Sequence, residues 1–288
     1  MNYVSHFGLR EPPFGITPDT SFFYPCRSSQ EALNTLLVAI GNGEGFLKIT
    51  GEVGTGKTLL CRTLMRTLDA HCVTAYIPNP SLEPRTFLLA VAEELSVAME
   101  PGLDQHRLLR GITRMLLEHA RAGKRVVLCM DEAQAMPFET METLRLLTNL
   151  ETEKRKLLQV VLFGQPELDR RLASESIRQL RQRITFQHDL GALGRDELGA
   201  YVAHRLAIAG YSGPPIMGRS ATRLLHKASR GLPRLVNILM HKSLLLVFGE
   251  GSLKIERRHV RAAAEDTPAA ASLRRSWWPK LKASQATE

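Results

Sequence analysis

Gly51-Glu-Val-Gly-Thr-Gly-Lys-Thr58 directly follows an apolar run, Phe46–Thr50, that is expected to be a strand. The stretch has the spacing G-x-x-x-x-G-K-S/T, in which glycines let the backbone turn its N–H groups toward a polyphosphate. Lys57 is expected to reach the β and γ phosphates, and Thr58 to offer its hydroxyl to Mg²⁺. The stretch therefore predicts a phosphate-binding loop between a strand and a helix, and a glycine-rich turn without a ligand is the alternative.

The helix after this loop would point its positive N-terminal end at the phosphates. The residues expected to contact the nucleotide here are Gly51, Glu52, Val53, Gly54, Thr55, Gly56, Lys57, Thr58 and Leu59.

Two carboxylates end a second apolar run, Arg125–Met130, and complete the expected site. An apolar run that stops abruptly at acids is typical of a buried parallel strand whose C-terminal end carries chemistry. Asp131 is expected to hold Mg²⁺, and Glu132 to polarise the attacking water. The pair could instead cap a helix that starts near Pro137. The phosphate-binding loop upstream favours the catalytic interpretation.

Composition agrees with an intracellular enzyme of ordinary size. The 288 residues are 44% hydrophobic, which is enough for a sizeable α/β core and a smaller second unit. No stretch approaches about 18 uninterrupted apolar residues, and the N-terminus lacks the pattern of a signal peptide. The four cysteines have no metal-ligand spacing and are expected to be reduced. We therefore expect a cytoplasmic protein without a transmembrane segment.

The net charge of +9 predicts an anionic binding partner besides the nucleotide, either nucleic acid or lipid head groups. Part of the excess lies in residues 274–282, where basic residues flank Trp277 and Trp278. Such a segment could rest at a membrane interface or be a disordered, solvated tail. A weak contact with anionic lipid or DNA is accordingly expected.

Expected strands and helices alternate along the first two thirds of the chain. The expected strands are 46–50, 73–77, 126–130, 157–163 and 184–190. The expected helices are 31–40, the segment after the phosphate loop, 84–99, one around 108–116, 143–149, one from Arg195, 221–229, 233–248 and 256–264. Alternation of this kind predicts a parallel sheet covered on both faces.

The expected organisation has four parts. Residues 1–44 would form an N-terminal segment and the first helix of the core, and 45–192 the α/β core with the phosphate-binding loop. Residues 193–267 would form a helical lid, and 268–288 a basic tail that contains tryptophan.

Several motifs in a common order give the chain a family resemblance. They are the segments His6–Asp19, Asp131–Gln134 and Phe163–Leu168. With the phosphate-binding loop they make the chain, from about Tyr3 to Pro268, resemble the AAA+ ATPases of the general secretion pathway A type. Within these it resembles the ATPases of mannose-sensitive haemagglutinin pilus assembly. Longer relatives continue into a transmembrane helix and a cell-wall-binding region, which this sequence lacks, and this difference favours the short pilus type.

The resemblance implies a P-loop NTPase fold of the AAA+ type, in which a three-layer α/β/α parallel sheet is followed by a small C-terminal helical lid domain. It implies that Phe14 and Ile16, in the N-terminal segment, lie beside the adenine. Gln165 would contact the γ-phosphate or the attacking water, and a plain strand-ending glutamine is the alternative.

Two arginines receive roles from the same resemblance. Arg181 would be a finger inserted into a neighbouring subunit's site, and it is favoured over Arg183. Arg178, Arg181 and Arg183 could equally form a solvated helix face. Arg234 would sense the nucleotide from the lid. It follows Pro233, a residue suited to the first turn of a helix. A surface arginine is the alternative.

The expected function is an ATP-hydrolysing, Mg²⁺-dependent AAA+ motor or switch that supports assembly of a bacterial envelope machine, either a pilus of this type or a type II secretion apparatus. Its expected partners are ATP, further copies of itself in a ring or dimer, and envelope membrane proteins, which could hold it at the inner membrane. The alternative is a DNA-associated AAA+ ATPase of the transposition, recombination or replication type. Against that stands the lack of an appended helix-turn-helix or a single-strand-binding pattern. A scaffold that binds ATP without turnover is a third possibility, which Glu132 disfavours.

Overall fold

A computed structural model describes residues 2–97, 104–153 and 155–271. The chain forms two compact units, one from Ile16–Leu193 and the other from Met1–Gly15 together with Gly194–Glu288. They are called the core unit and the helical unit below. The basic tryptophan-containing segment from residue 274 lies outside the described residues.

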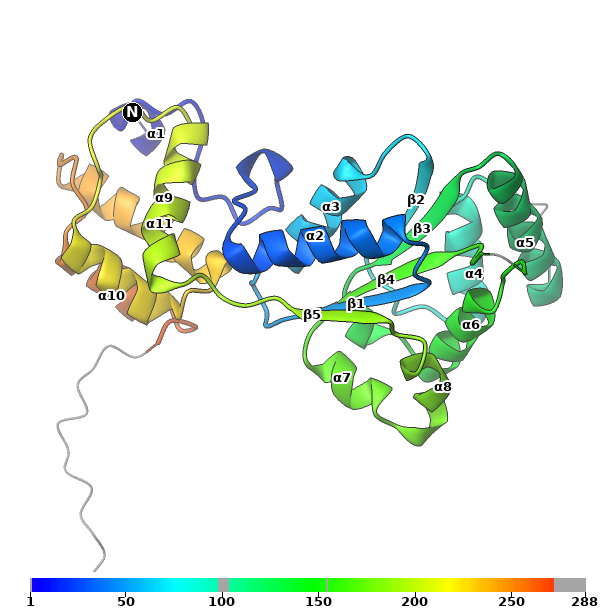
Figure 1. Cartoon of the computed structure of the whole chain (residues 1–288). Helices are drawn as coiled ribbons and strands as arrows, with labels where there is room; N and C mark the ends of the chain where they lie inside the picture. Colours follow the sequence, from blue (N-terminus) through cyan, green and yellow to red (C-terminus); the bar gives the residue numbers. More distant parts are fainter. Residues whose placement is uncertain (1, 98–103, 154, 272–288) are drawn as a thin grey trace, which may run out of the picture. The chain divides into compact units, whose positions relative to one another are not determined.

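A parallel sheet of five strands forms the centre of the core unit (Figure 1). Its strands are β1 (Phe46–Thr50), β2 (Cys72–Ile77), β3 (Arg125–Met130), β4 (Gln159–Gly164) and β5 (Phe186–Asp189). Their order is β2-β3-β4-β1-β5, with every neighbouring pair parallel. The predicted strands are confirmed, although β4 and β5 each start two residues later than expected. The carboxyl ends of β3, β4 and β1 therefore lie side by side.

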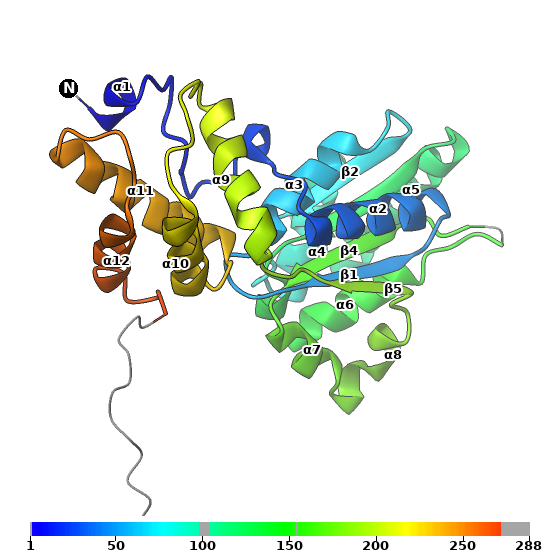
Figure 2. The same cartoon turned by 60° about the vertical axis from the view of Figure 1, so that its left-hand side comes forward.

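Helices cover both faces of this sheet, because its residues alternate between two apolar clusters (Figures 1 and 2). On one face, Leu47 and Ile49 pack with α2 (Arg27–Gly41) and α3 (Lys57–Thr67). The other face carries Phe46, Leu128 and Leu162. It is covered by α4 (Pro84–Glu94), α5 (Gln105–Arg121), α6 (Phe138–Thr148), α7 (Glu167–Leu172) and α8 (Arg178–Arg181). The three-layer α/β/α prediction is confirmed.

Helix boundaries differ from the expected ones at identifiable residues. The helix expected over 84–99 ends at Glu94, because Ser96 adopts a left-handed φ of 54° that an α-helix does not continue through. Met99 lies outside the described residues. Helix α6 begins at Phe138, five residues earlier than expected, directly after Pro137. Helices α7 and α8 were not expected, since six and four residues are too few to show a helical period.

The helical unit contains α9 (Arg195–Ile208), α10 (Arg219–Ser229), α11 (Pro233–Gly249) and α12 (Arg257–Glu265). Their positions agree with the expected helices. The side chain of Glu197 accepts the backbone N–H of Gly194 at 2.8 Å and so closes the first turn of α9. None of the helices in the described part of the chain is long and apolar enough to cross a membrane.

Residues 1–15 belong to the helical unit and not to the core, where the sequence analysis placed them. Short helix α1 (Tyr3–His6) buries Tyr3, whose ring lies edge-on to His241 with centroids 5.4 Å apart. The buried guanidinium of Arg205 donates to the carbonyl of Pro13 at 2.6 Å. Apolar side chains and this arginine fix the segment on α9 and α11, which its sequence alone did not reveal.

Candidate active site

The loop between β1 and α3 has the geometry that its glycines require. Gly54 and Gly56 have φ values of 85° and 100°, which side chains with a Cβ rarely adopt. At Gly51 a Cβ would lie 2.7 Å from the carbonyl oxygen of Leu190, so a larger residue does not fit there. The loop is thus shaped by glycine at three of its eight positions, as the spacing predicted.

Lys57 lies at the start of α3 with only 5% of its surface exposed. Its Nζ donates to the carbonyl of Gly51 at 2.8 Å and to that of Glu52 at 3.0 Å. Burial lowers the pKa of this ammonium, although the nearby carboxylates of Glu132 and Asp131 act in the opposite direction. A buried cation bonded only to neutral carbonyls is a ready partner for phosphate oxygens, because these carry the charge that carbonyls lack.

Thr58 and Asp131 meet at the mouth of the loop. The hydroxyl of Thr58 donates to Oδ2 of Asp131 at 2.5 Å, and the backbone N–H of Glu132 donates to Oδ1 at 3.0 Å. Asp131 is 2% exposed, and burial raises the pKa of its carboxyl. A hydroxyl and a buried carboxylate in contact are hard oxygen donors that suit Mg²⁺, which takes few protein ligands and keeps its other positions for phosphate and water.

Glu132 is held by two glutamine side chains from different elements. Its Oε2 accepts from Nε2 of Gln134 at 2.5 Å and from Nε2 of Gln165 at 3.1 Å. Oε1 of Gln134 in turn accepts the backbone N–H of Gln165 at 3.0 Å, which closes the triangle. No residue that the structure describes donates to Oε1 of Glu132. We call Glu132, Gln134 and Gln165 the amide clamp.

The backbone at Glu132 is left-handed, with φ 50° and ψ 36°. This conformation costs a residue with a Cβ on the order of 1–3 kcal/mol, and such strain persists where the surroundings hold it. Arg171 of α7 supplies part of that support. Its guanidinium donates to the carbonyls of Gln134 and, at 2.5 Å, of Met136.

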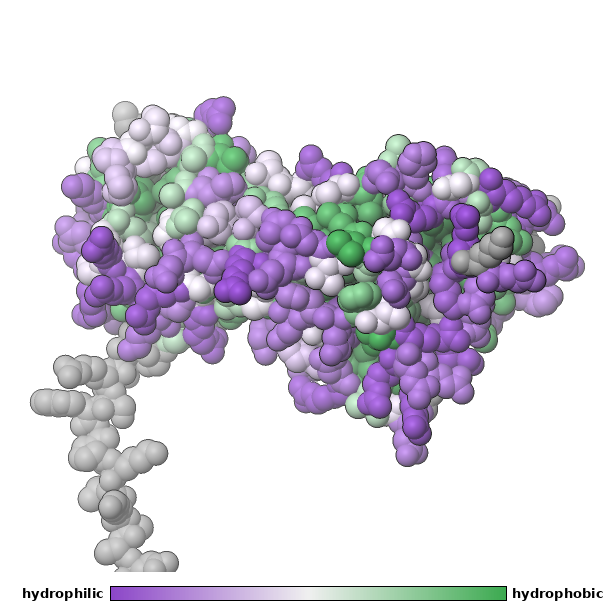
Figure 3. Space-filling model, in the orientation of Figure 1, coloured by the Kyte–Doolittle hydropathy of each residue, from purple (hydrophilic) through white to green (hydrophobic). Residues whose placement is uncertain are grey.

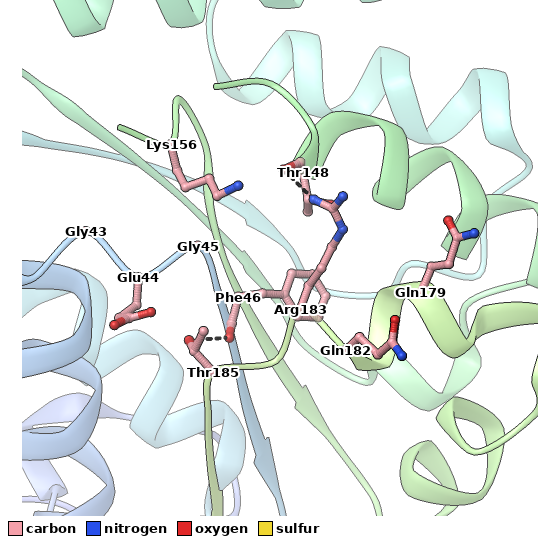
Figure 4. Close-up of a pocket in the computed structure, with 10 residues that line it drawn as sticks. All are labelled: Gly43, Glu44, Gly45, Phe46, Thr148, Lys156, Gln179, Gln182, Arg183 and Thr185. Carbon is pink, nitrogen blue, oxygen red and sulfur yellow. Dashed lines mark hydrogen bonds between the residues drawn. The ribbon is translucent and has the colours of Figure 1, made fainter. Parts of the chain in front are cut away.

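The two candidate finger residues have different environments. Arg183 donates to the carbonyl of Thr148 at 3.0 Å, in a cleft of about 500 Å³ near the start of β1 (Figure 4). Arg181, on α8, is exposed, and its side chain forms no hydrogen bond or ion pair with the described residues. An exposed guanidinium of this kind is available to another chain, and the assignment of the finger to Arg181 stays a prediction.

The other expected nucleotide contacts are distributed between the two units. In the core unit Glu52 and Val53 are exposed at the loop tip, and Leu59 is half-buried in the first turn of α3. Ile16 of the core unit is 59% exposed, whereas Phe14 of the helical unit is 2% exposed. Arg234 is exposed at the second position of α11, also in the helical unit. Of the two residues expected beside the adenine, Ile16 is the one with exposed surface that a base would cover.

The sequence analysis gave no role to Gln134 or Arg171. Gln134 was part of a motif, but its clamp depends on a partner 31 positions away on another strand end. Arg171 lies on a helix that has no sequence signal. Neither contact could be inferred from spacing.

Comparison with known proteins gives one family and one curated relative. The family model of the AAA domain matches residues 40–172. General secretion pathway protein A of Aeromonas hydrophila is 43% identical over 262 residues, which are 91% of this chain and 48% of that protein. The chain thus spans about half the length of the curated relative it matches.

Solved structures of similar fold are more distant in sequence. The ORC2 protein of Aeropyrum pernix, in complexes with ADPNP and ADP, has a TM-score of 0.65 at 16% identity, covering 89% of this chain and 73% of that one. Cdc6p of Pyrobaculum aerophilum has a TM-score of 0.67 at 18% identity, over 86% and 71% of the two chains. The RuvB Holliday junction branch migration motor of Thermotoga maritima has a TM-score of 0.55 at 17% identity, over 83% and 68%. The chain has the α/β fold of the P-loop AAA+ ATPases, and its sequence is similar to that of general secretion pathway protein A.

Proposed function

We propose that this chain binds ATP with Mg²⁺ and hydrolyses it, using Glu132 as the general base. The observation that carries the proposal is the amide clamp. It anchors one carboxylate oxygen of Glu132, the residue after Asp131, and leaves the other oxygen for a water. A carboxylate with one anchored and one available oxygen is suited to take a proton from a positioned water.

The chain's own residues account for binding and for the proton. The loop N–H groups and Lys57 would hold the phosphates, with phosphate oxygens replacing the carbonyls of Gly51 and Glu52 on Nζ. Mg²⁺, when bound at Thr58 and Asp131, would offset the negative charge of the β and γ phosphates. Water then attacks the γ-phosphorus, Oε1 of Glu132 accepts its proton, and the bond between the γ-phosphorus and ADP breaks.

We further propose that hydrolysis supports assembly of a bacterial envelope machine, either a mannose-sensitive haemagglutinin pilus or a type II secretion apparatus. The support is the 43% identity to general secretion pathway protein A, which extends over 91% of this chain. The cytoplasm, at the inner membrane, is the compartment that suits both ATP and envelope partners.

A homo-oligomer belongs to the same proposal. The exposed side chain of Arg181 has no hydrogen-bond or ion-pair partner among the described residues, and it is remote in sequence from the loop. A finger that acts on a neighbour needs a head-to-tail contact of the kind that closes into rings. Ile16, Phe14 and Arg234 remain proposed contacts of the nucleotide.

A DNA-associated ATPase is the second candidate, and one surface favours it. Arg107, Arg110, Arg114 and Arg121 lie along α5, and none of them forms an ion pair with the described residues. We call these four the arginine row. The helix has 17 residues and is therefore about 25 Å long, a length over which a phosphate backbone presents several charges.

Two substitutions test the primary proposal. Lys57→Ala should abolish tight nucleotide binding, because it removes the cation that reaches the phosphates. Glu132→Gln should keep ATP bound and lose turnover, because it removes only the base. Isothermal titration with a non-hydrolysable ATP analogue and a phosphate-release assay separate the two effects. Equal phosphate release by wild type and Glu132→Gln would contradict the mechanism.

A further inference from the structure

A buried lysine lies in β1, a strand whose other side chains are apolar except for Thr50. Lys48 of β1 is paired with Leu162 of β4 and Gln187 of β5 in the strand register. Its side chain is only 8% exposed. The proposed chemistry does not use this buried charge, which sits three residues before the phosphate-binding loop.

The partner of Lys48 is Asp169 of α7, to which its Nζ donates in an ion pair. The carboxylate is 47% exposed, so the pair reaches from inside the sheet to the surface of the unit. Burying the ammonium is costly unless it is paired. Asp169 therefore compensates the buried charge of Lys48, and it can do so only when α7 lies at one position relative to β1.

Helix α7 connects this pair to the amide clamp at both of its ends. Its first turn is tied to Gln165, whose carbonyl accepts the backbone N–H of Leu168 at 2.9 Å. Arg171, two residues after Asp169, donates to the carbonyls of Gln134 and Met136 behind Glu132. Both glutamines of the clamp are thus attached to α7, one through its backbone and one through Arg171.

Apolar packing holds α7 on one side only. Leu168 and Leu172 are buried against the core on one side of the helix. Another side borders a cavity of about 430 Å³, lined by Lys48, Asp169 and Arg181 among others. A helix of six residues has little stability of its own, and a cavity supplies no contacts to hold it.

We propose that the Lys48–Asp169 ion pair positions α7 against β1 and thereby keeps the amides of Gln134 and Gln165 on Glu132. Lys48 and Asp169 are positioning residues, since neither touches the phosphate-binding loop. This inference rests on the proposed hydrolysis for its effect on turnover, but the placement of α7 can be measured without it.

The first test compares Lys48→Met, Asp169→Asn and the double variant Lys48→Met/Asp169→Leu in the full chain. Each should lower kcat roughly ten- to a hundredfold, the usual range for groups that orient a reacting residue, while the KM for ATP stays within about twofold. Lys48→Arg should keep a higher kcat than Lys48→Met, because it keeps the positive charge. Lys156→Met is the matched control, since it breaks a surface pair with Glu151. The apolar double variant keeps the test valid if a single variant with an unpaired buried charge fails to fold.

The second test is hydrogen exchange of the amides in residues 165–172, which needs no catalysis. Exchange should be at least several-fold faster in Lys48→Met and Asp169→Asn than in wild type or Lys156→Met, while β1 stays protected. Unchanged exchange in this segment would overturn the inference, whatever the ATPase activity. So would a kcat equal to that of wild type in a folded Lys48→Met protein that hydrolyses ATP. If wild type shows no turnover but exchange responds as expected, the hydrolysis proposal fails and the positioning of α7 stands.

Discussion

Single residues of the site are arranged for binding at the expense of stability. Asp131 is buried at 2% exposure, and burial raises the pKa of its carboxyl above the ordinary 3.8. Lys57 is buried as well, and the pKa of its ammonium is lowered by the same cause. In both cases the folded protein disfavours the charged form that a metal or a phosphate would select. Such conflicts are expected where a sequence serves function.

Asp131→Asn should therefore stabilise the protein while abolishing Mg²⁺-dependent turnover. The pKa of Asp131 is higher in the folded than in the unfolded chain, so the cost of its charge is absent below the unfolded value and complete above the folded one. The stability gained by replacing the carboxylate should therefore grow as the pH rises above the ordinary pKa of 3.8, to roughly 1 kcal/mol once Asp131 is fully charged. Urea unfolding without metal or nucleotide measures it. Asp189→Asn, at an exposed strand end, is the control and should change stability by less than about 0.5 kcal/mol. A loss of stability in Asp131→Asn at pH 7 would contradict this account.

The amide clamp makes its own prediction about a residue that no motif identified. Gln134→Ala removes one of two amides on Oε2 of Glu132 and frees the backbone N–H of Gln165. We expect kcat to fall about tenfold or more with little change in ATP affinity, because the phosphate-binding loop is untouched. Gln182→Ala, at an exposed position after α8, is the control. Steady-state phosphate release at saturating ATP measures the effect, and wild-type kcat in Gln134→Ala would remove the clamp from the mechanism.

Elements divide clearly into those that the sequence predicts and those that it does not. Strands β1 and β3 could be predicted because apolar runs of about five residues stop at glycine or at acids. Helix α5 could be predicted because its leucines and isoleucine repeat at helical spacing. Helices α7 and α8 could not, since their length hides any period and their apolar residues are few. The part of the site that depends on them, Arg171 above all, was missed for that reason.

The arginine row on α5 predicts weak DNA binding that is independent of sequence. The row offers phosphate contacts but no group arranged to read bases, so affinity should fall steeply with salt. Arg110→Ser/Arg114→Ser should reduce binding to a random duplex at low salt and lower the salt slope. Arg257→Ser/Arg261→Ser on α12 removes the same charge from exposed positions elsewhere and is the control. Fluorescence anisotropy across a salt series measures both, and a nanomolar, sequence-specific complex at physiological salt would instead favour the DNA-associated function.

At the scale of the whole molecule, the surface of the core unit retains features that suit association. Figure 3 shows a mostly hydrophilic face with an apolar area over α2. Val38 of α2 is 61% exposed, and Phe186 of β5 is 39% exposed. Exposed large apolar side chains of this kind are candidate contacts between proteins. Together with the exposed side chain of Arg181, they are consistent with the proposed site shared between subunits.

Hydrolysis is therefore expected to need a neighbour. Activity per subunit should rise with protein concentration, since a finger that acts on another copy works only after assembly. Arg181→Ala should bind ATP normally but lose turnover by about 10³-fold, at the lower end of the range for such fingers. Mixing Arg181→Ala with Lys57→Ala should recover part of the activity, because an intact loop on one subunit meets an intact arginine on the other. Arg178→Ala, exposed on the same helix, is the control.

If Arg183→Ala shows the complementation instead, the finger lies two residues later and must leave the carbonyl of Thr148 on assembly. A constant activity per subunit down to a monomer proven by light scattering would reject the shared site altogether, because a lone subunit would then hold every group that the reaction needs.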